Sequence, residues 1–266
     1  MISYDDLTFH LDLSKKIYVG YSGVPDSSAL LYLLHINNIS NVEAIHINHN
    51  LSDNSLKWEE HCRKTTDKLG IKCHLESIDI EVDGDGLESA ARKARYKIFA
   101  KYLKKNEQIV LGHHSDDVAE TFLLRLFRGT GLDGLESLSV KRKVGEGYLV
   151  RPLINLSKKN ILIYLKEQEI DVVKDESNFE EDQDRNFVRN TIIPSIEQRW
   201  ANVSSRISNT ANFIKIRNNS YEMLFKEKYQ NLIGNQIKVS ELKKIQKEFV
   251  VDIIRLSIKR QNIAMP

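Results

Sequence analysis

The sequence predicts an α/β protein with a doubly wound parallel sheet and a helical C-terminal extension. Apolar, β-leaning segments alternate with helical segments five times between residues 17 and 168. This rhythm is typical of right-handed βαβ units. Polar motifs follow the first, second and fourth β-leaning segments. Because ligands bind at the carboxyl ends of strands in such sheets, these motifs predict one shared ligand site.

The strands and helices of this sheet can be assigned in chain order. Short apolar runs predict strands at residues 17–21, 42–48, 71–80, 108–112 and 148–153. Helical spacing predicts helices at residues 28–36, 55–69, 87–105, 116–128 and 157–168. Gly70 is a stop signal for the second helix, and Ser157 is an N-cap for the fifth. Residues 83–86 (DGDG) predict a loop.

The composition of the chain changes from residue 175, where an acidic and polar segment follows the alternating strands and helices. Helical spacing resumes at 185–196, and residues 201–230 and 240–262 predict further helix. Residues 201–266 hold 12 Lys and Arg against 5 Asp and Glu, whereas the rest of the chain carries net charge −5. We therefore predict a catalytic domain at 1–205 and a basic helical domain at 206–266. The surplus positive charge suggests contact with a polyanion, although a solvated helix face would also explain it.

Length and composition favour a cytoplasmic globular protein. The chain has 266 residues, of which 41% are hydrophobic, and no run reaches transmembrane length. The N-terminus is acidic and lacks the apolar core of a signal peptide. Only two cysteines occur, as expected for a reducing compartment.

A polar loop between the first strand and helix predicts a phosphate site. Its backbone N–H groups and the helix N-terminus point at one spot, where the helix dipole favours an anion. No lysine follows a glycine as a Walker A loop requires. A plain turn with a helix cap remains the alternative. The loop residues are Ser22, Gly23, Val24, Pro25, Asp26 and Ser27.

The segment HHSDDVAET after the fourth strand predicts a second part of the site. Asp117 and Glu120 are three residues apart, so they share one helix face. They could bind Mg²⁺, directly or through water, or a substrate ammonium group. His113 could contact a phosphate or developing charge. The alternative is an ordinary helix start with acidic first-turn residues.

Two groups of arginines complete the candidate residues. Arg92 and Arg95 lie one helical turn apart and could clamp a phosphate. Arg185, Asn186 and Arg189 suit an ordered nucleic-acid strand. A solvated basic face explains the first pair equally well, and helix capping is the alternative for the second group.

Two further patterns carry no site. Residues 129–134 read G-x-G-x-x-G, but they follow a helix, whereas the dinucleotide motif follows a strand. Cys62 and Cys73 each neighbour a histidine, but they lack the spacing of zinc ligands. We expect two buried structural thiols and no protein-bound metal site.

Eight motifs in chain order resemble the N-type ATP pyrophosphatases and, within that group, the bacterial tRNA(Ile)-lysidine synthetases. They are S-G-x-x-D-S, HINHNLS (46–52), ARKARY (91–96), HHSDDVAET (113–121), RGTGLDGL (128–135), RPL (151–153), DESN (175–178) and RNFVR with a later IP (185–194). One such motif is weak, but eight in order over most of the chain are specific. The resemblance implies an adenine nucleotide alpha hydrolase-like fold.

The resemblance also implies a two-step ligation. ATP with Mg²⁺ adenylates the C2 oxygen of the wobble cytidine in an isoleucine tRNA with a CAU anticodon. Free lysine then displaces AMP, so that lysidine, AMP and pyrophosphate are the products. A homodimer is compatible with the resemblance. By motif position it implies ATP binding by the loop 22–27, catalysis by His113, Asp117, Glu120, Arg92 and Arg95, lysine binding by Asp117 and Glu120, and tRNA binding by Arg185, Asn186 and Arg189.

The chain departs from the family pattern at three places. Val24 stands where the family has a second loop glycine, which would cost about 1–3 kcal/mol if that position required positive φ. Val118 replaces a common glutamine, and many relatives continue beyond residue 266. Three alternatives remain: a tRNA thiolase, which normally has cysteines at the cleft; a silent binder of tRNA or nucleotide; and an amidotransferase synthetase, for which no glutaminase-like segment is present.

Overall fold

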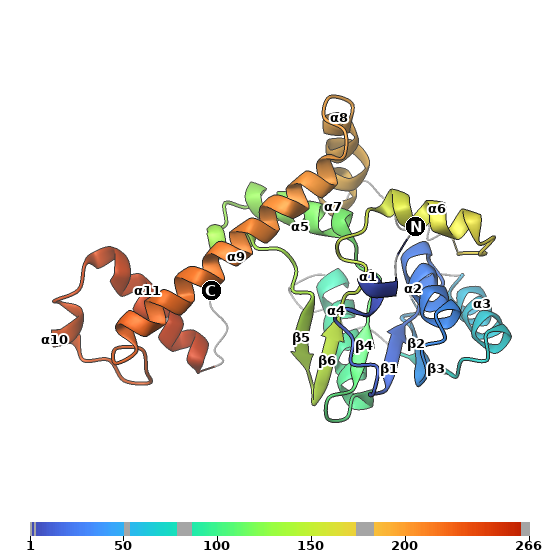
Figure 1. Ribbon diagram of the computed structural model, residues 1–266, viewed down its shortest axis with the longest axis horizontal. Coiled ribbons are helices and arrows are strands. Elements are labelled where there is room, and N and C mark those ends of the chain that lie inside the picture. The colour runs from blue at the N-terminus through green and yellow to red at the C-terminus, as the bar shows by residue number, and fades with distance from the viewer. Residues whose placement is uncertain (1, 3, 51–53, 79–86, 174–183, 262–266) are drawn as a thin grey trace.

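The computed structural model describes residues 2, 4–50, 54–78, 87–173 and 184–261 (Figure 1). Within them, strands form one sheet in the order β3-β2-β1-β4-β6-β5. All neighbouring strands are parallel except β5 and β6, which pair antiparallel. The strands are β1 (Ile17–Gly20), β2 (Val42–Asn48), β3 (Cys73–Ser77), β4 (Gln108–Val110), β5 (Lys141–Val144) and β6 (Gly147–Val150).

Helices follow most of the strands and continue after the sheet is complete. Those associated with the sheet are α1 (Tyr4–Thr8), α2 (Pro25–Ile36), α3 (Ser55–Lys68), α4 (Leu87–Tyr102), α5 (Ser115–Phe127), the 3₁₀ turn η1 (Leu132–Leu135) and α6 (Lys158–Glu167). Those after it are α7 (Asp184–Phe187), the π-helical turn η3 (Val188–Ile192), α8 (Ile193–Glu197), α9 (Val203–Tyr229), α10 (Val239–Leu242) and α11 (Lys247–Arg260).

The sheet is covered on both faces, because side chains of each strand alternate between two cores. Val19 of β1 is fully buried in the core formed with α2 and α6, where Leu30 and Ile161 lie. Its neighbour Tyr18 points into the opposite core, which α4 closes with Phe99. The predicted doubly wound α/β fold is therefore confirmed.

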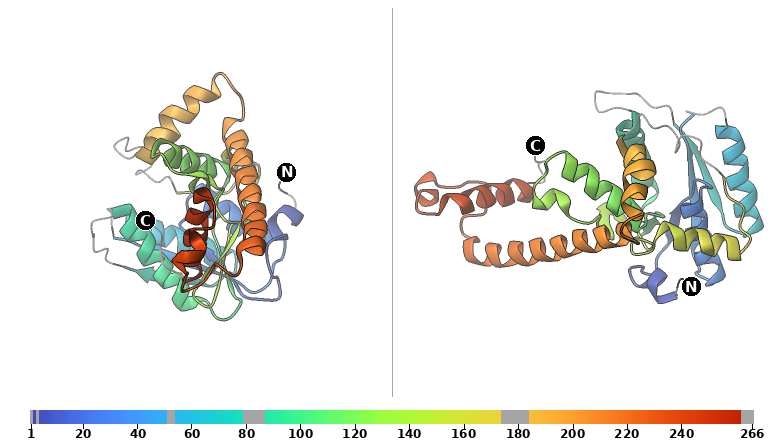
Figure 2. Two further views of the ribbon diagram at one scale, coloured as in Figure 1. Left: turned by 90° about the vertical axis from the view of Figure 1, so that its left-hand side faces the viewer. Right: turned by 90° about the horizontal axis from the view of Figure 1, so that it is seen from above.

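Helix α9 links the sheet to the C-terminal helices. Its Ala211 is buried in a small core with Val118 of α5 and Ile154. Near its other end, Phe225 packs in a separate core with Ile253 of α11. Figure 2 shows α10 and α11 lying beside the C-terminal half of α9, away from the sheet. The predicted domain boundary at 205/206 falls in the first turn of α9 and stays a prediction.

Three element predictions need correction. The edge strand β5 was not expected, because its sequence KRKV lacks the apolar alternation that indicates a strand. The helix expected at 240–262 is two helices, α10 and α11, with Lys243 as the C-cap of the first. The last strand is 147–150 and not 148–153. The loop at 83–86, the motif at 175–178 and the end of the strand predicted at 71–80 lie outside the described residues.

Candidate functional site

The loop between β1 and α2 is fixed at its glycine. Gly23 has φ +79°, which is a left-handed conformation that a side chain would strain. A Cβ there would also lie 3.2 Å from Cys62 Sγ. The Gly23 carbonyl accepts hydrogen bonds from Ser28 Oγ at 3.0 Å and from the Val173 N–H at 2.9 Å. These contacts hold the loop as a preformed turn.

Two serine hydroxyls line this turn at the start of α2. The Ser22 N–H donates to Ser27 Oγ at 3.2 Å, and the two hydroxyl oxygens are 3.2 Å apart. Ser27 Oγ donates to the Val24 carbonyl at 3.1 Å. Pro25 lies in the first turn of α2, as predicted. The hydroxyls and the N–H groups of the helix start form a cradle whose chemistry fits the phosphates of ATP.

Val24 is not strained. Its φ of −72° and ψ of 162° are ordinary extended backbone, and Gly23 is the loop residue that needs positive φ. The strain considered for a valine at this position is therefore absent.

We expect Val24→Gly to leave the ATP dissociation constant unchanged or to weaken binding slightly. The substitution relieves no strain and adds backbone freedom that costs about 0.5–1 kcal/mol on ordering. Isothermal titration with a non-hydrolysable ATP analogue measures the effect. Tighter binding by at least threefold would contradict the geometry of Val24.

The loop after β4 touches the phosphate loop directly. A Cβ built on Gly112 would lie 2.6 Å from the Asp26 carbonyl oxygen, so only glycine fits at this contact. The Asp26 carboxylate Oδ1 lies 2.5 Å from Lys158 Nζ, and the Lys158 N–H donates to Asp116 Oδ2 at 2.8 Å. The β4 loop, α5 and α6 thus meet at the start of α2.

His114 lies at the centre of this meeting point. It is 4% exposed, and its ring nitrogens lie 3.5 Å from carboxylate oxygens of Asp26, Asp116 and Asp117. Although burial opposes the charge, contacts with Asp116 and Asp26 raise the pKa of His114 to about 10. The same pairing lowers the pKa of Asp116 to about 2 against the effect of burial. The ring is therefore a cation at neutral pH.

These two pKa shifts predict how folding stability varies with pH. The raised pKa of His114 stabilises the fold below its unfolded value of 6.5, and this contribution is lost as pH rises towards 10. The lowered pKa of Asp116 stabilises the fold above 3.8, and that contribution is lost as pH falls towards 2. Urea unfolding between pH 5 and 10 should show a decline that His114→Gln lacks. Parallel curves for both proteins would contradict a charged His114.

The neighbouring His113 is in the opposite state. Burial is the main cause that lowers the pKa of His113 to about 3, and the guanidinium of Arg151 contributes. Arg151 Nε donates to His113 Nδ1 at 3.2 Å, so Nδ1 is an acceptor. A neutral ring with this tautomer leaves Nε2–H as its free donor group. His113 could therefore donate to a substrate oxygen.

The carboxylates of Asp117 and Glu120 share a face of α5, as predicted, and both are bound by arginines. Arg185 Nη2 donates to Asp117 Oδ1 at 3.0 Å, and Arg185 Nε donates to Glu120 Oε2 at 2.8 Å. Arg189 donates to both Glu120 oxygens, at 2.6 and 2.8 Å. Glu120 is 1% exposed. The pair predicted to bind a substrate cation thus binds the side-chain cations expected to contact nucleic acid.

The other predicted residues lie around this group. Asn186 of α7 is buried. In the sequence it lies between Arg185 and Arg189. Arg92 and Arg95 are exposed on α4. The Arg95 guanidinium contributes to the lowered pKa of His113, which indicates that it lies near the site.

Sequence reasoning missed Lys158 and the role of Arg151. Lys158 follows the predicted helix cap Ser157, and Arg151 is the first residue of the RPL motif. Neither position carries a local chemical signal, because the Lys158–Asp26 contact joins residues 132 apart.

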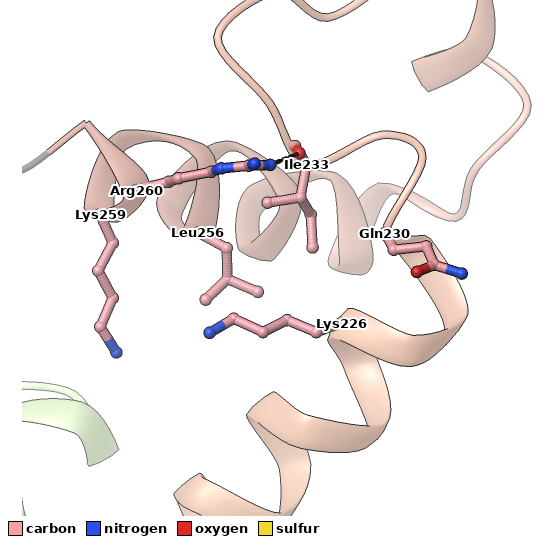
Figure 3. Close-up of a pocket in the computed structure, with 6 residues that line it drawn as sticks. All are labelled: Lys226, Gln230, Ile233, Leu256, Lys259 and Arg260. Atoms are coloured by element: carbon pink, nitrogen blue, oxygen red, sulfur yellow. Dashed lines mark hydrogen bonds between the residues drawn. The ribbon is translucent and has the colours of Figure 1, made fainter.

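A pocket of about 390 Å³ lies elsewhere, between α9 and α11 (Figure 3). Its cations already have partners: Lys226 and Lys259 each contact Glu222 at 2.6 Å, and Arg260 Nη1 donates to the Ile233 carbonyl at 3.0 Å. This pocket contains none of the predicted catalytic residues.

Three further observations concern the described residues as a whole. Within residues 2–173 and 184–261, apart from the gaps given above, no three Asp, Glu, His or Cys side chains are grouped to hold a metal ion. In the same part of the chain, no helix has the length and hydrophobicity to cross a membrane. Cys62 is buried on α3, where burial raises the pKa of its thiol, and Cys73 is half-buried on β3.

Comparisons with known proteins found a family model, relatives and a solved structure that are similar to this chain. Residues 4–196 match the family model of the PP-loop domain. The chain is 33% identical to the tRNA(Ile)-lysidine synthase of Legionella pneumophila strain Lens over 95% of this chain. It is 37% identical to the tRNA(Ile)-lysidine synthase of Buchnera aphidicola subsp. Schizaphis graminum, again over 95% of this chain. It spans 59% and 58% of these relatives. The U34-tRNA thiolase NcsA from Methanococcus maripaludis shares the fold, with a TM-score of 0.61 at 19% identity over 76% of this chain and 72% of that one.

Proposed function

Because its residues 4–196 match the PP-loop domain model, this chain belongs to that ATP-using family, and we propose that it attaches lysine to the wobble cytidine of an isoleucine tRNA with a CAU anticodon. One observation carries the proposal. A buried carboxylate pair, Asp117 and Glu120, lies on the helix that follows the β4 loop and already binds two side-chain cations. An amine substrate would meet an activated nucleotide at such a place. The names of the relatives support the same reaction.

In the proposed first step, the tRNA attacks the α-phosphate of ATP and pyrophosphate leaves. The cytidine C2 oxygen forms the bond to phosphorus, and the bond to the pyrophosphate oxygen breaks. The N–H groups of the loop at Gly23 and the hydroxyls of Ser22 and Ser27 would stabilise the charge on the phosphates. Mg²⁺ would neutralise the triphosphate when bound, and Asp26, whose Oδ1 already contacts Lys158 Nζ, is the carboxylate of the phosphate loop that could hold it.

In the proposed second step, the lysine ε-amine attacks C2 and AMP leaves with the C2 oxygen. Asp117 and Glu120 would attract and orient the ammonium groups of lysine before the attacking ε-amine loses its proton to water. His113 would donate a hydrogen bond from Nε2 to the base or to the phosphate. The cytidine must leave its stack to reach these groups.

The arginines on the carboxylate pair imply an order of binding. Arg185 and Arg189 occupy the oxygens that lysine needs, so at least one must move when lysine binds. Phosphates of a bound tRNA would give these guanidiniums new partners. We therefore infer that tRNA binds first and opens the lysine site. The roles predicted for Arg185, Asn186 and Arg189 in tRNA binding agree with this order.

The wider setting of the proposal follows from the substrates. The basic residues of the C-terminal helices would hold the tRNA backbone, and a cytoplasmic location suits free tRNA and lysine. A homodimer is compatible with the family. A thiolase is disfavoured because Cys62 is fully buried and Cys73 is on β3, on the far side of β2 from the phosphate loop. A silent binder would bind tRNA or ATP without forming AMP.

The deciding experiment is the incorporation of labelled lysine into an isoleucine tRNA transcript with a CAU anticodon. The reaction contains ATP and Mg²⁺, and methionine tRNA and labelled arginine are the controls. We expect lysine-specific, ATP-dependent labelling of the isoleucine tRNA alone. Formation of AMP without labelling would indicate another second substrate, and absence of AMP would favour the silent binder.

A further inference from the structure

Two guanidinium groups flank the ring of Tyr96 on α4. The Cζ atom of Arg142, from the edge strand β5, lies 4.4 Å from the ring centroid. The Cζ atom of Arg92, one turn earlier on α4, lies 5.6 Å from it. Both arginines are exposed. The aromatic ring therefore holds two cations near one another at the surface.

The guanidinium of a third arginine, Arg151, is buried near this pair. Arg151 is 2% exposed, and it donates from Nη1 to the Ser139 carbonyl at 2.5 Å as well as to His113. Within the part of the chain that the structure describes, no carboxylate pairs with Arg92, Arg142 or Arg151. The burial of Arg151 and the neighbouring guanidiniums of Arg142 and Arg92 lower its pKa. Among the described residues, these three guanidiniums are therefore not neutralised by an ion pair.

Helix α9 contributes a fourth cation. Lys215 lies between Ala211 and Asn218 on this helix. The Ala211 carbonyl accepts a hydrogen bond from the Ser137 N–H at 3.1 Å, and the Asn218 side chain donates one to Glu136 at 2.9 Å. All three are on one face of the helix, which rests on the segment before β5. Burial lowers the pKa of Lys215, Glu136 opposes the shift, and Arg151 adds to it. Lys215 therefore lies on the face of α9 that rests on the segment leading into β5, and Glu136 belongs to that segment.

The position of these four residues suits a long anion. We call Arg92, Arg142, Arg151 and Lys215 the β5-edge cluster. In the sheet order, β5 is three strands from β1, so at ordinary strand spacing Arg142 lies about 14 Å to the side of β1, whereas Arg151 reaches His113. Figure 1 shows that β5 is the edge strand on the side towards which α9 extends. A polymer with regularly spaced phosphates can reach from the site across this edge.

We propose that the β5-edge cluster binds backbone phosphates of the tRNA strand next to the reacting nucleotide, with Arg142 and Lys215 as contacts and Arg151 as a positioning residue. This inference rests on the proposed tRNA substrate. The guanidinium fork of Arg142 matches phosphate oxygens, and Tyr96 restricts its orientation. Arg151 links the cluster to His113, so that the phosphate position is fixed relative to the reacting base.

The test is the salt dependence of tRNA binding by full-length variants of the chain. We expect Arg142→Gln to weaken binding of the CAU isoleucine tRNA transcript roughly tenfold, and to reduce the slope of log K against log[salt] by about 0.7–1. Arg142→Lys should keep most of the slope because it keeps the charge. Lys143→Gln is the matched control, since Lys143 is adjacent on β5 but points to the other face of the sheet. ATP binding is measured for each variant and should be unchanged.

Each outcome bears on the proposal. Equal losses in Arg142→Gln and Lys143→Gln would overturn it in favour of general surface charge. Loss of ATP affinity in Arg142→Gln would assign the cluster to the nucleotide triphosphate instead. Normal tRNA binding in Arg142→Gln, with lysidine formation intact in the unaltered chain, would overturn this inference alone. Absence of tRNA binding by the unaltered chain would overturn the proposed function with it.

Discussion

Replacing Glu120 by glutamine is expected to reduce lysine transfer at least about 30-fold, because truncating one partner of a buried charge pair costs 2–5 kcal/mol. Glu120 is 1% exposed and accepts three hydrogen bonds from Arg185 and Arg189. A neutral amide offers one acceptor oxygen, and its NH₂ group would face the guanidinium donors. The attraction for an incoming ammonium group would be lost with the charge.

The same change should lower the free energy of unfolding by about 2–3 kcal/mol, below the usual cost of breaking a buried pair because the arginines can turn towards solvent. Urea unfolding and single-turnover lysine incorporation measure the two effects, and AMP formation reports the first step separately. Asp133→Asn is the control, since that carboxylate is exposed and lies 3.5 Å from Arg255. Unchanged lysine transfer in Glu120→Gln would rule out its role in amine binding.

Gly112→Ala is expected to lower the rate of AMP formation about 100-fold, the effect of a misplacement of about 1 Å at a reacting centre. The new Cβ would lie 2.6 Å from the Asp26 carbonyl oxygen and 2.7 Å from its carbon. Both are backbone atoms of the first turn of α2, so the phosphate loop and the β4 loop must move apart. ATP would then lie out of line with the residues of α5.

Gly131→Ala provides the matched control for this prediction. A Cβ at Gly131 meets no atom within 4 Å, and its φ of −73° suits any residue. AMP formation and thermal unfolding should be near the unaltered values in this variant. A fully active Gly112→Ala enzyme would show that the two loops do not need their close contact.

The sheet was predictable because its signals are local. Ile17, Tyr18 and Val19 form an apolar run that ends at polar residues, and β4 and β6 repeat that pattern. The edge strand β5 carries lysine and arginine instead, because an exposed edge needs charge to avoid pairing with another chain. Its strand character comes from hydrogen bonds to β6, which no local pattern records.

The residues of the candidate site were predictable from the sequence, but the ion pairs between them were not. Spacing on one helix brought Asp117 and Glu120 together, since residues three apart share a face. Their partners Arg185 and Arg189 are at least 65 residues away, and only the folded chain brings them to α5. The opposite charge states of His113 and His114 likewise depend on Arg151 and on Asp26, which come from other elements.

Helix α9 has a consequence for the size of the substrate. Its contacts with α5 at Ala211 and with α11 at Phe225 lie 14 residues apart on one continuous helix, so about 21 Å of helix separates them. The helix therefore holds the surface near α5 and the surface of the C-terminal helices at a fixed separation. An RNA shorter than this span could occupy the catalytic end or the far end, but not both together. For the proposed tRNA substrate, length in addition to anticodon sequence would then decide which RNAs are held at both ends of the helix.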